Sequence, residues 1–194
     1  MEMDALEKWV LSSSAWGLFS RRLIVPWVLS FARPPQEAVV LDIGCGRGSE
    51  AQEFATRFPG WQLTATDYDA DMVALAERRL ARFEDRVRVE RADATALTYP
   101  DDSFDLAVAL FVWHHVGDWA TATREAHRVL RPGGTLVLAD LLAPAFGGPA
   151  RRLPAPAGTY SLPELRSALA GAGFGRWRVR VGGRLWYRLV AVAS

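Results

Sequence analysis

The sequence predicts an α/β protein built on a mostly parallel sheet, and three observations carry this prediction. Short apolar segments alternate with helical segments from residue 38 onward. An apolar strand runs directly into a loop with glycines at positions 44, 46 and 48. The chain then ends in two extended segments around a Gly-Gly pair. Alternating β and α units imply parallel strands with helices on both faces, because each crossover lays a helix on the sheet.

The spacing of apolar residues places the individual elements. A first helical segment carries Leu6, Trp9, Val10, Ser13 and Trp16, and a second carries Leu23, Val25, Trp27, Val28 and Phe31 before Pro34 and Pro35 stop it. Strands are predicted at 38–43, 61–66, 86–91, 104–110 and 134–140, with helices at about 49–58, 70–82 and 118–130.

The end of the chain departs from this alternation. A helix is predicted to start near Ser161, where Glu164 completes a capping box, and to stop at the glycines of 171–173. Residues 177–181 and 185–192 then read as two strands of a hairpin around Gly182 and Gly183. We therefore expect the parallel sheet to close with an antiparallel hairpin.

Length and composition limit the classes of function. With 194 residues, of which 50% are hydrophobic, the chain is expected to form one domain with a sizeable core. The net charge of +1 gives no overall basic field, so nucleic acid is not an expected partner. Cys45, the one cysteine of the sequence, has no intrachain partner for a disulfide, which favours a cytoplasmic location.

No membrane-spanning segment or export signal is expected. The apolar run 23–29 contains Pro26 and is shorter than the roughly 20 residues that span a bilayer. Acidic residues at positions 2, 4 and 7 do not suit a secretory signal. Arg21 and Arg22 before the apolar run suggest a role at a membrane surface, but no sustained basic face accompanies them in the sequence.

The strand Val39 to Ile43 and the loop Gly44-Cys45-Gly46-Arg47-Gly48 predict a nucleotide-type ligand site. Glycines let the backbone turn tightly and approach a ligand at the start of the next helix. A dinucleotide fingerprint would need Gly or Ala at the sixth position counted from Gly44, where this chain has Ser49. The loop therefore argues against a dinucleotide.

Three aspartates follow or end predicted strands, where ligands of open α/β sheets lie. Asp67 follows the second strand, and its two carboxylate oxygens suit the two hydroxyls of a ribose. Asp93 follows the third strand, and Asp42 directly precedes the glycine loop. An aspartate after a strand is often a helix N-cap instead, a role that Asp69 or Asp71 could fill beside Asp67.

These motifs resemble those of the class I S-adenosylmethionine (SAM) dependent methyltransferases. The resemblance covers residues 38–140 and includes the paired histidines after the strand at 104–110 and the string Val129-Leu130-Arg131-Pro132-Gly133-Gly134-Thr135-Leu136. It is nearest to the ubiquinone/menaquinone and small-molecule branch. The resemblance implies a Rossmann-like, doubly wound, seven-stranded sheet with SAM as cofactor and S-adenosylhomocysteine as product. It also implies O- or C-methylation of a small, largely apolar acceptor.

The resemblance implies a role for each residue around the loop. Asp42 would face the amino end of the methionine moiety, Asp67 the ribose, Asp93 the adenine amino group and Tyr68 the adenine face, although Tyr68 could equally be a packing aromatic. The full set of predicted cofactor-binding residues is Asp42, Gly44, Cys45, Gly46, Gly48, Asp67, Tyr68, Asp93, Ala94 and Ala109.

His114 and His115 are the candidate catalytic residues, because a histidine can accept a proton from a hydroxyl or carbon nucleophile near neutral pH. Each could instead pack beneath the cofactor or bond a backbone carbonyl; of the two, we favour His115 as the base. His127 reads as structural or solvated. His114, His115 and Asp118 do not match a recognised metal-ligand spacing, so no metal is predicted.

Residues 1–37 are interpreted as an N-terminal helical cap on a SAM-binding domain at 38–194. The cap and the loop 141–160 would close over the cofactor as a lid. Candidate wall residues are Trp9, Trp16, Phe19, Trp27, Trp113 and Phe146, with ordinary core as the alternative reading. A SAM-binding enzyme of cyclising or eliminating chemistry and a SAM-binding accessory subunit remain alternatives. The acceptor, the methylated atom and the formation of a homodimer stay open.

Overall fold

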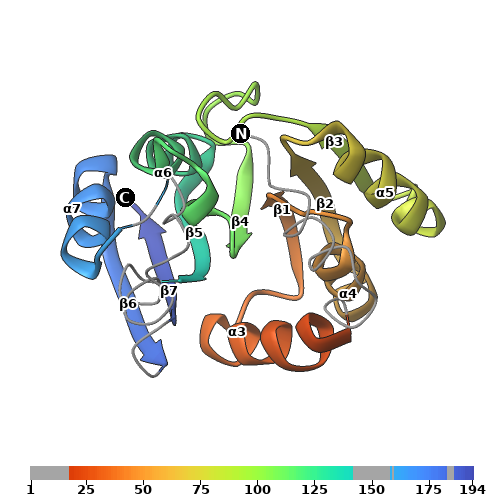
Figure 1. Cartoon of the computed structure of the whole chain (residues 1–194), viewed down its shortest axis with the longest axis horizontal. Coiled ribbons are helices and arrows are strands. Elements are labelled where there is room, and N and C mark those ends of the chain that lie inside the picture. Colours follow the sequence, from red (N-terminus) through yellow and green to blue (C-terminus); the bar gives the residue numbers. More distant parts are fainter. Residues whose placement is uncertain (1–17, 142–157, 159, 183–185) are drawn as a thin grey trace, which may run out of the picture.

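The computed structural model describes residues 18–141, 158, 160–182 and 186–194, and within them the chain forms one seven-stranded sheet (Figure 1). The strands run in the order β3-β2-β1-β4-β5-β7-β6. Neighbours from β3 to β5 pair in parallel, and β7 pairs antiparallel with both β5 and β6. The bounds are β1 Glu37–Ile43, β2 Gly60–Asp67, β3 Val87–Arg91, β4 Phe104–Leu110, β5 Leu130–Leu141, β6 Phe174–Gly182 and β7 Trp186–Ala193. The predicted parallel sheet with a closing hairpin is confirmed.

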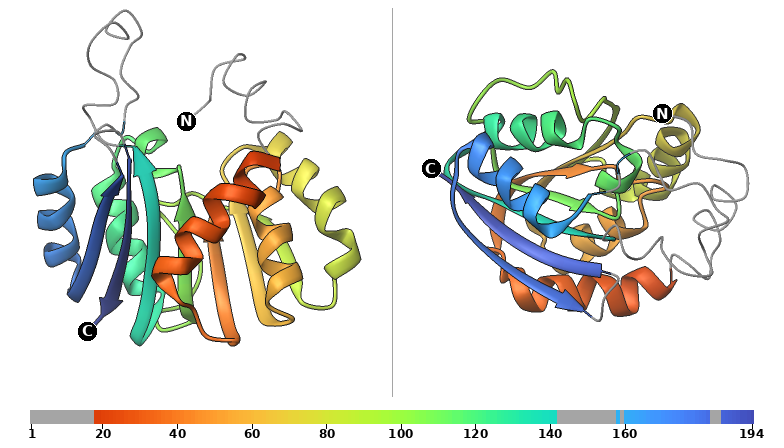
Figure 2. Two further views of the ribbon diagram at one scale, coloured as in Figure 1. Left: turned by 90° about the horizontal axis from the view of Figure 1, so that it is seen from below. Right: turned by 60° about the vertical axis from the view of Figure 1, so that its left-hand side comes forward.

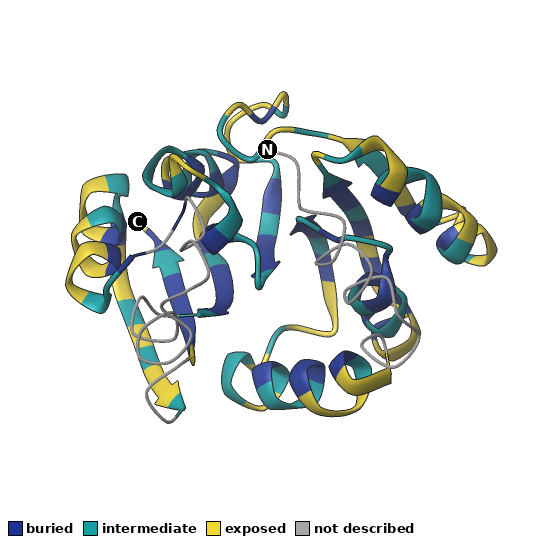
Figure 3. Ribbon diagram, in the orientation of Figure 1, coloured by how far each residue is buried: buried dark blue, intermediate teal, exposed yellow. Residues whose placement is uncertain are grey.

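Helices cover both faces of the sheet, as the right-hand view of Figure 2 shows. They are α3 Val25–Ala32, α4 Ser49–Arg57, α5 Ala70–Leu80, α6 Trp119–Arg128 and α7 Leu162–Ala172, with short turns η1 Ser20–Ile24, η2 Ala81–Phe83 and η3 Trp113–His115. Buried side chains of α3, α4 and α5 form one apolar cluster with the sheet, and those of α6 and α7 form a second cluster. The buried strands, dark blue in Figure 3, contribute side chains to both clusters.

Local chemistry explains where the elements begin and end. Ser161 and Glu164 form the predicted capping box at the start of α7, and Gly173 ends that helix at φ +105°. β5 begins at Leu130, four residues before its predicted start, because Leu130 pairs with Phe104 ahead of a register shift. The hairpin's turn at Gly183 lies outside the described residues.

The described part of the predicted cap packs on the sheet. Ile24, Val25 and Val28 are at most 3% exposed and belong to the cluster under α4 and α5. α3 crosses the sheet face with its N-terminal end toward the edge at which β5 ends (Figure 2, left). The described part of this stretch thus contributes both core side chains and exposed ones, among them Leu18 and Leu23, and its role as a lid over the cofactor stays a prediction. Residues 1–17 lie outside the described residues.

The strand order places the site. The chain winds outward from β1 to β2 and β3, and then returns to β4 on the other side of β1. Ligands of open α/β sheets bind at such a switch point, beyond the carboxyl ends of the strands. The glycine loop, Asp67, Asp93 and the two histidines all follow carboxyl ends, so the fold brings them to one edge.

Candidate active site

The glycine loop is pinned to the neighbouring strand β2. The backbone N–H groups of Gly44 and Cys45 both donate to the carbonyl oxygen of Thr66, each at 2.8 Å. The three glycines of the loop take φ values of +75°, +54° and +76°, a region that residues with a side chain rarely adopt. The sequence therefore needs glycine here for its backbone conformation.

Asp67 organises this loop as well as facing the site. Its Oδ2 accepts the N–H of Gly46 at 2.8 Å, and its Oδ1 accepts the N–H of Asp69 at 2.9 Å. Burial raises the pKa of the Asp67 carboxyl, while these backbone donors pull that pKa down. The capping alternative falls to Asp69, whose side chain accepts from Asp71 N at the start of α5. Asp67 thus stays directed at the edge of the sheet.

A cavity of 370 Å³ opens at this edge, within the size range of small-molecule sites. Eight of the ten predicted cofactor-binding residues line it: Asp42, Gly44, Cys45, Gly46, Asp67, Tyr68, Asp93 and Ala94. His115 lines the same cavity. The fold thus gathers residues from the ends of β1, β2, β3 and β4 around one space.

Acidic groups are concentrated at the inner end of the cavity. Asp42 is 2% exposed, and its Oδ2 has no hydrogen-bond partner within the described part of the chain. Burial raises the pKa of Asp42 well above its usual value, and the nearby Glu50 and Asp67 raise it further. Burial also raises the pKa of Glu50, whose Oε1 accepts from the hydroxyl of Ser20. A buried, unpaired carboxylate oxygen of this kind suits a cationic group of a ligand.

Asp93 and Tyr68 lie at the outer end. Asp93 Oδ1 accepts from the backbone N–H of Thr95 at 2.8 Å and from its hydroxyl at 2.7 Å, and these bonds lower the pKa of the carboxyl. Tyr68 is 45% exposed, and the guanidinium of Arg91 lies 5.5 Å from its ring centroid. The ring therefore lies at the surface of the cavity and not in the core.

Two predicted cofactor residues are placed elsewhere. Ala109 is fully buried in β4 as part of the cluster under α6 and α7. Gly48 caps α4, and a Cβ there would lie 3.1 Å from Leu80 and 3.2 Å from Ala76, so it permits close packing of α4 on α5. Neither residue lines the cavity.

The predicted aromatic wall is also corrected. Trp113 is fully buried and donates its indole N–H to Thr123 at 2.9 Å. Trp27, which belongs to α3, packs against Trp186. Phe19 is 39% exposed and does not line the cavity. Trp9, Trp16 and Phe146 lie outside the described residues.

The two histidines have different surroundings. His115 lines the cavity, and burial together with the neighbouring His114 lowers its pKa to about 4. The imidazole of His115 is therefore neutral at pH 7. His114 is 6% exposed and points away from the cavity lining to Asp140, with its Nδ1 against Oδ1 of that carboxylate. The ring centroids of the two histidines are 3.9 Å apart.

The carboxylate of Asp140 accepts hydrogen bonds that hold η3, the turn that carries both histidines. Its Oδ2 accepts the backbone N–H of His114 and the hydroxyl of Tyr160, both at 3.0 Å, and Tyr160 in turn lies 2.5 Å from the hydroxyl of Tyr187. Gly158 N donates to His114 O at 3.1 Å, and a Cβ on Gly158 would lie 2.2 Å from the carbonyl oxygen of Trp113. Side chains and backbone from three distant segments thus hold η3 in place.

Sequence reasoning missed several wall residues: Arg47, Glu50, Met72, Thr95, Leu110, Phe111, Val112, Gly117 and Asp118. Glu50 carried a usable signal, since an acid two residues after the last loop glycine lies in the first turn of the next helix. Phe111, at φ +59°, and Val112 carried none, because the turn after β4 is irregular. No cluster of metal-ligating side chains occurs among the residues with a described position, and none of their helices is long and apolar enough to cross a membrane.

Comparison with known proteins agrees with this geometry. Residues 41–138 match the family model described as a methyltransferase domain. A demethylmenaquinone methyltransferase of Thermus thermophilus is 32% identical over 161 residues, covering 70% of this chain and 73% of that protein. The 27-O-demethylrifamycin SV methyltransferase of Amycolatopsis mediterranei is 41% identical over 119 residues, covering 56% of this chain and 41% of that protein. The chain belongs to the methyltransferase-domain family.

Solved structures share the fold at lower identity. A SAM-dependent methyltransferase from Aquifex aeolicus has a TM-score of 0.78 at 21% identity, with both chains fully covered. The [4+2]-cyclase SpnF has a TM-score of 0.74 at 23% identity, covering 88% of this chain and 80% of that one. Among the curated relatives, the chain spans 41% of the rifamycin enzyme and 45% of a demethylmenaquinone methyltransferase from Deinococcus radiodurans.

Proposed function

We propose that this chain binds SAM in the cavity at the switch point and transfers its methyl group to a small, largely apolar acceptor. The observation that carries the proposal is the convergence of Asp42, Gly46, Asp67 and Asp93 on one cavity in a chain of the methyltransferase-domain family. The relatives are named for demethylrifamycin SV and demethylmenaquinone, which are the first acceptors to try.

The residues present fit the cofactor. The unpartnered Oδ2 of Asp42 would accept from the ammonium of the methionine moiety, which supplies the cation that a buried carboxylate needs. Each oxygen of Asp67 bonds one backbone N–H and keeps a lone pair for a ribose hydroxyl. Asp93 and the exposed ring of Tyr68 would meet the adenine. A Cβ at Gly46 would project into open space, so the loop backbone leaves room for a ligand.

SAM supplies an activated methyl on a sulfonium, so the protein's main tasks are alignment of the acceptor and exclusion of water. Where the acceptor must lose a proton, His115 would accept it, because it lines the cavity and is neutral at pH 7. His114 would position His115 through the contact of the two rings and its bond to Asp140. A pKa of about 4 makes His115 a weak base, so its contribution belongs to the low end of general-base catalysis, about 10²-fold.

Calorimetry with SAM, S-adenosylhomocysteine and NAD tests the cofactor. We expect heats for the first two and none for NAD, and the reverse would overturn the proposal. Incubation with SAM and the two named acceptors then tests the reaction, with S-adenosylhomocysteine as the readout. The protein could instead bind SAM and change an acceptor chemically without forming S-adenosylhomocysteine. That result would favour the cyclising alternative, since the [4+2]-cyclase SpnF has the same fold. Binding of SAM with turnover that requires a second protein would favour an accessory subunit.

The remaining expectations about context are part of the same proposal. A single buried cysteine suits a reducing cytoplasm. Nucleic acid is not an expected partner, and a homodimer is left to sedimentation measurements.

A further inference from the structure

The charges of the chain are strongly segregated. Residues 18–36 and 174–194 contain eight of the 23 basic residues and none of the 22 acidic ones. The remainder therefore holds 15 basic residues against 22 acidic ones. A net charge of +1 conceals this division, and the two basic segments lie at opposite ends of the sequence.

The fold brings the two segments together. α3 packs beside the hairpin: the guanidinium of Arg188 lies 4.5 Å from the ring centroid of Trp27 and 5.0 Å from that of Phe31. Arg178 lies 4.9 Å from the Phe31 centroid and donates to its carbonyl oxygen at 3.2 Å. Arg180 pairs with Arg188 across the hairpin, so both side chains lie on the α3 face of the sheet.

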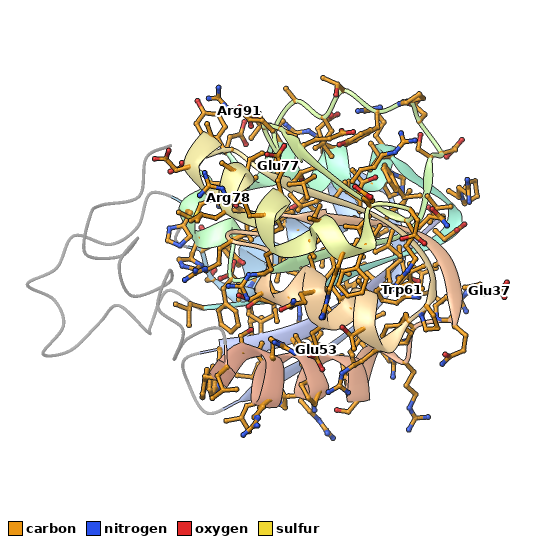
Figure 4. All side chains as sticks on the ribbon, turned by 90° about the vertical axis from the view of Figure 1, so that its right-hand side faces the viewer. Glu37, Glu53, Trp61, Glu77, Arg78 and Arg91 are labelled. Atoms are coloured by element: carbon orange, nitrogen blue, oxygen red, sulfur yellow. The ribbon has the colours of Figure 1, made fainter. Side chains whose placement is uncertain are left out.

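The arginines of the edge strand β6 face outward along this side. Arg176, Arg178 and Arg180 alternate along β6, and all three are exposed (yellow on β6 in Figure 3). The opposite end of the sheet carries both signs of charge, with Glu77, Arg78 and Arg91 exposed there (Figure 4). The exposed arginines of β6 therefore form a basic strip beside the C-terminal part of α3, whereas Arg21, which precedes α3, pairs with Glu53 of α4 at 2.9 Å.

Exposed apolar side chains gather at the adjoining edge of the sheet. Among the residues whose positions are described, the large hydrophobic ones that are more than a third exposed are Leu18, Phe19, Leu23, Tyr68, Val181 and Trp186. The first three belong to the segment whose Ser20 bonds Glu50 at the start of α4, just beyond β1. Trp186 pairs with Leu141, the last residue of β5, and Val181 pairs with Tyr187 beside it. Tyr68 lines the cavity, and the other five belong to segments near the same edge of the sheet.

From this arrangement we infer that the chain docks on an anionic lipid surface through its α3 and β6 side, with the five exposed apolar residues entering the interface. Arginines are attracted to anionic headgroups, and aromatic and aliphatic side chains beside them bury in the headgroup region. Docking in this way brings the carboxyl edge of the sheet, where the cavity opens, next to the lipid. This inference does not depend on the reaction that the cavity performs.

Apolar residues near the edge of the sheet, together with the three exposed arginines of β6, favour lipid over the other partners. A protein interface concentrates its apolar residues in a central patch, and duplex DNA requires no exposed leucine or tryptophan. The sequence suggested a membrane-surface role from Arg21 and Arg22 and lacked a basic face to support it. The arginines of β6 supply that face.

Vesicle sedimentation with the full chain tests the inference. We expect binding about tenfold tighter to vesicles of phosphatidylcholine with about 30% phosphatidylglycerol than to pure phosphatidylcholine, and weaker binding at high salt. Arg176→Gln with Arg180→Gln should weaken binding to the anionic vesicles by about tenfold or more. Arg78→Gln with Arg88→Gln, the same change of charge on exposed residues at the other end of the sheet, is the matched control and should bind as the parent does.

A second variant tests the apolar part. Leu18→Ser with Leu23→Ser changes two side chains that are 52% and 57% exposed, so folding should be unaffected. We expect it to lose about tenfold in vesicle binding at low and high salt alike, because apolar insertion is not screened. Equal binding to neutral and anionic vesicles would overturn the inference, as would an equal loss in both arginine pairs. Binding to a DNA duplex without vesicle binding, or a dimer in sedimentation velocity that the Arg176 and Arg180 changes dissolve, would overturn it in favour of those partners.

Discussion

Gly44→Ala should destabilise the protein through a contact that the structure defines closely. A Cβ on Gly44 would lie 2.4 and 2.6 Å from the two methyl carbons of Val112, and Gly44 has φ +75°. Gly46 is the matched control within the same loop. It has φ +54°, and a Cβ there would meet no atom within 4 Å. Both substitutions strain the backbone, and Gly44→Ala adds a collision.

The backbone strain and the collision with Val112 each lower the free energy of unfolding, by different amounts. Left-handed backbone at an alanine costs about 1–2 kcal/mol, and overpacking costs about 1–3 kcal/mol more. We therefore expect the free energy of unfolding to fall by about 1–2 kcal/mol in Gly46→Ala and by about 2–5 kcal/mol in Gly44→Ala. Val112→Ala removes the two methyl carbons, so it should recover about 1–2 kcal/mol when combined with Gly44→Ala.

Urea unfolding followed by tryptophan fluorescence measures the parent, the three single variants and the Gly44 and Val112 double variant, and an unchanged slope with denaturant keeps the comparison to stability alone. The double-mutant cycle of Gly44 and Val112 isolates the collision from the strain. If Gly44→Ala is no less stable than Gly46→Ala, or if Val112→Ala restores nothing, then the loop after β4 does not lie against the glycine loop as described, and the cavity is shaped differently.

Three further changes test the site. Asp67→Ala should weaken SAM binding by about 1.5–3 kcal/mol in calorimetry, the worth of hydrogen bonds to a charged group, while Asp71→Ala on the surface should leave it unchanged. The pKa of His115 is lowered to about 4 in the folded protein, so the unfolded chain binds more protons between about pH 4 and 6.5. The free energy of unfolding should therefore fall by about 1–3 kcal/mol as the pH falls through that window. Urea unfolding of His115→Ala should not show this loss. Tyr160→Phe removes the hydroxyl that bonds Asp140 and should lower stability by about 1–3 kcal/mol with SAM affinity unaltered; a loss of affinity equal to that of Asp67→Ala would place Tyr160 in the cofactor site.

The sheet could be predicted because its signals are local. β1 and β4 are largely apolar runs, β2 and β3 alternate apolar with polar residues, and the alternation of strands with helices predicts the parallel pairing. The hairpin could be predicted from Gly182 and the two strands that flank it. β5 extended beyond its prediction because Leu130 pairs with Phe104, and pairing of this kind depends on a strand 26 residues away.

The acidic residues of the cavity could be predicted from the sequence, whereas the hydrogen bonds that hold the histidines in place could not. Asp42, Asp67 and Asp93 each follow or end a strand, so their meeting at one edge follows from the topology. The bond of Asp140 to His114 joins residues 26 apart, and Tyr160 reaches the same carboxylate from 20 residues away. Ala109 and Gly48 do not line the cavity, because closeness in sequence to a motif does not determine which residues face the ligand space.

The surface charge shows why a composition total is a poor guide to partners. A net charge of +1 excluded a basic field only on the assumption that charges are mixed. Arg178 of β6 bonds the carbonyl oxygen of Phe31, 147 residues away, because β6 and β7 close the sheet beside the helix that precedes β1. Since the potential at a surface falls off within about 8–10 Å at physiological salt, a partner responds to the local cluster and not to the sum. The same fold that sets Asp42, Asp67 and Asp93 around the cavity therefore separates the acidic ligand site from the basic docking side.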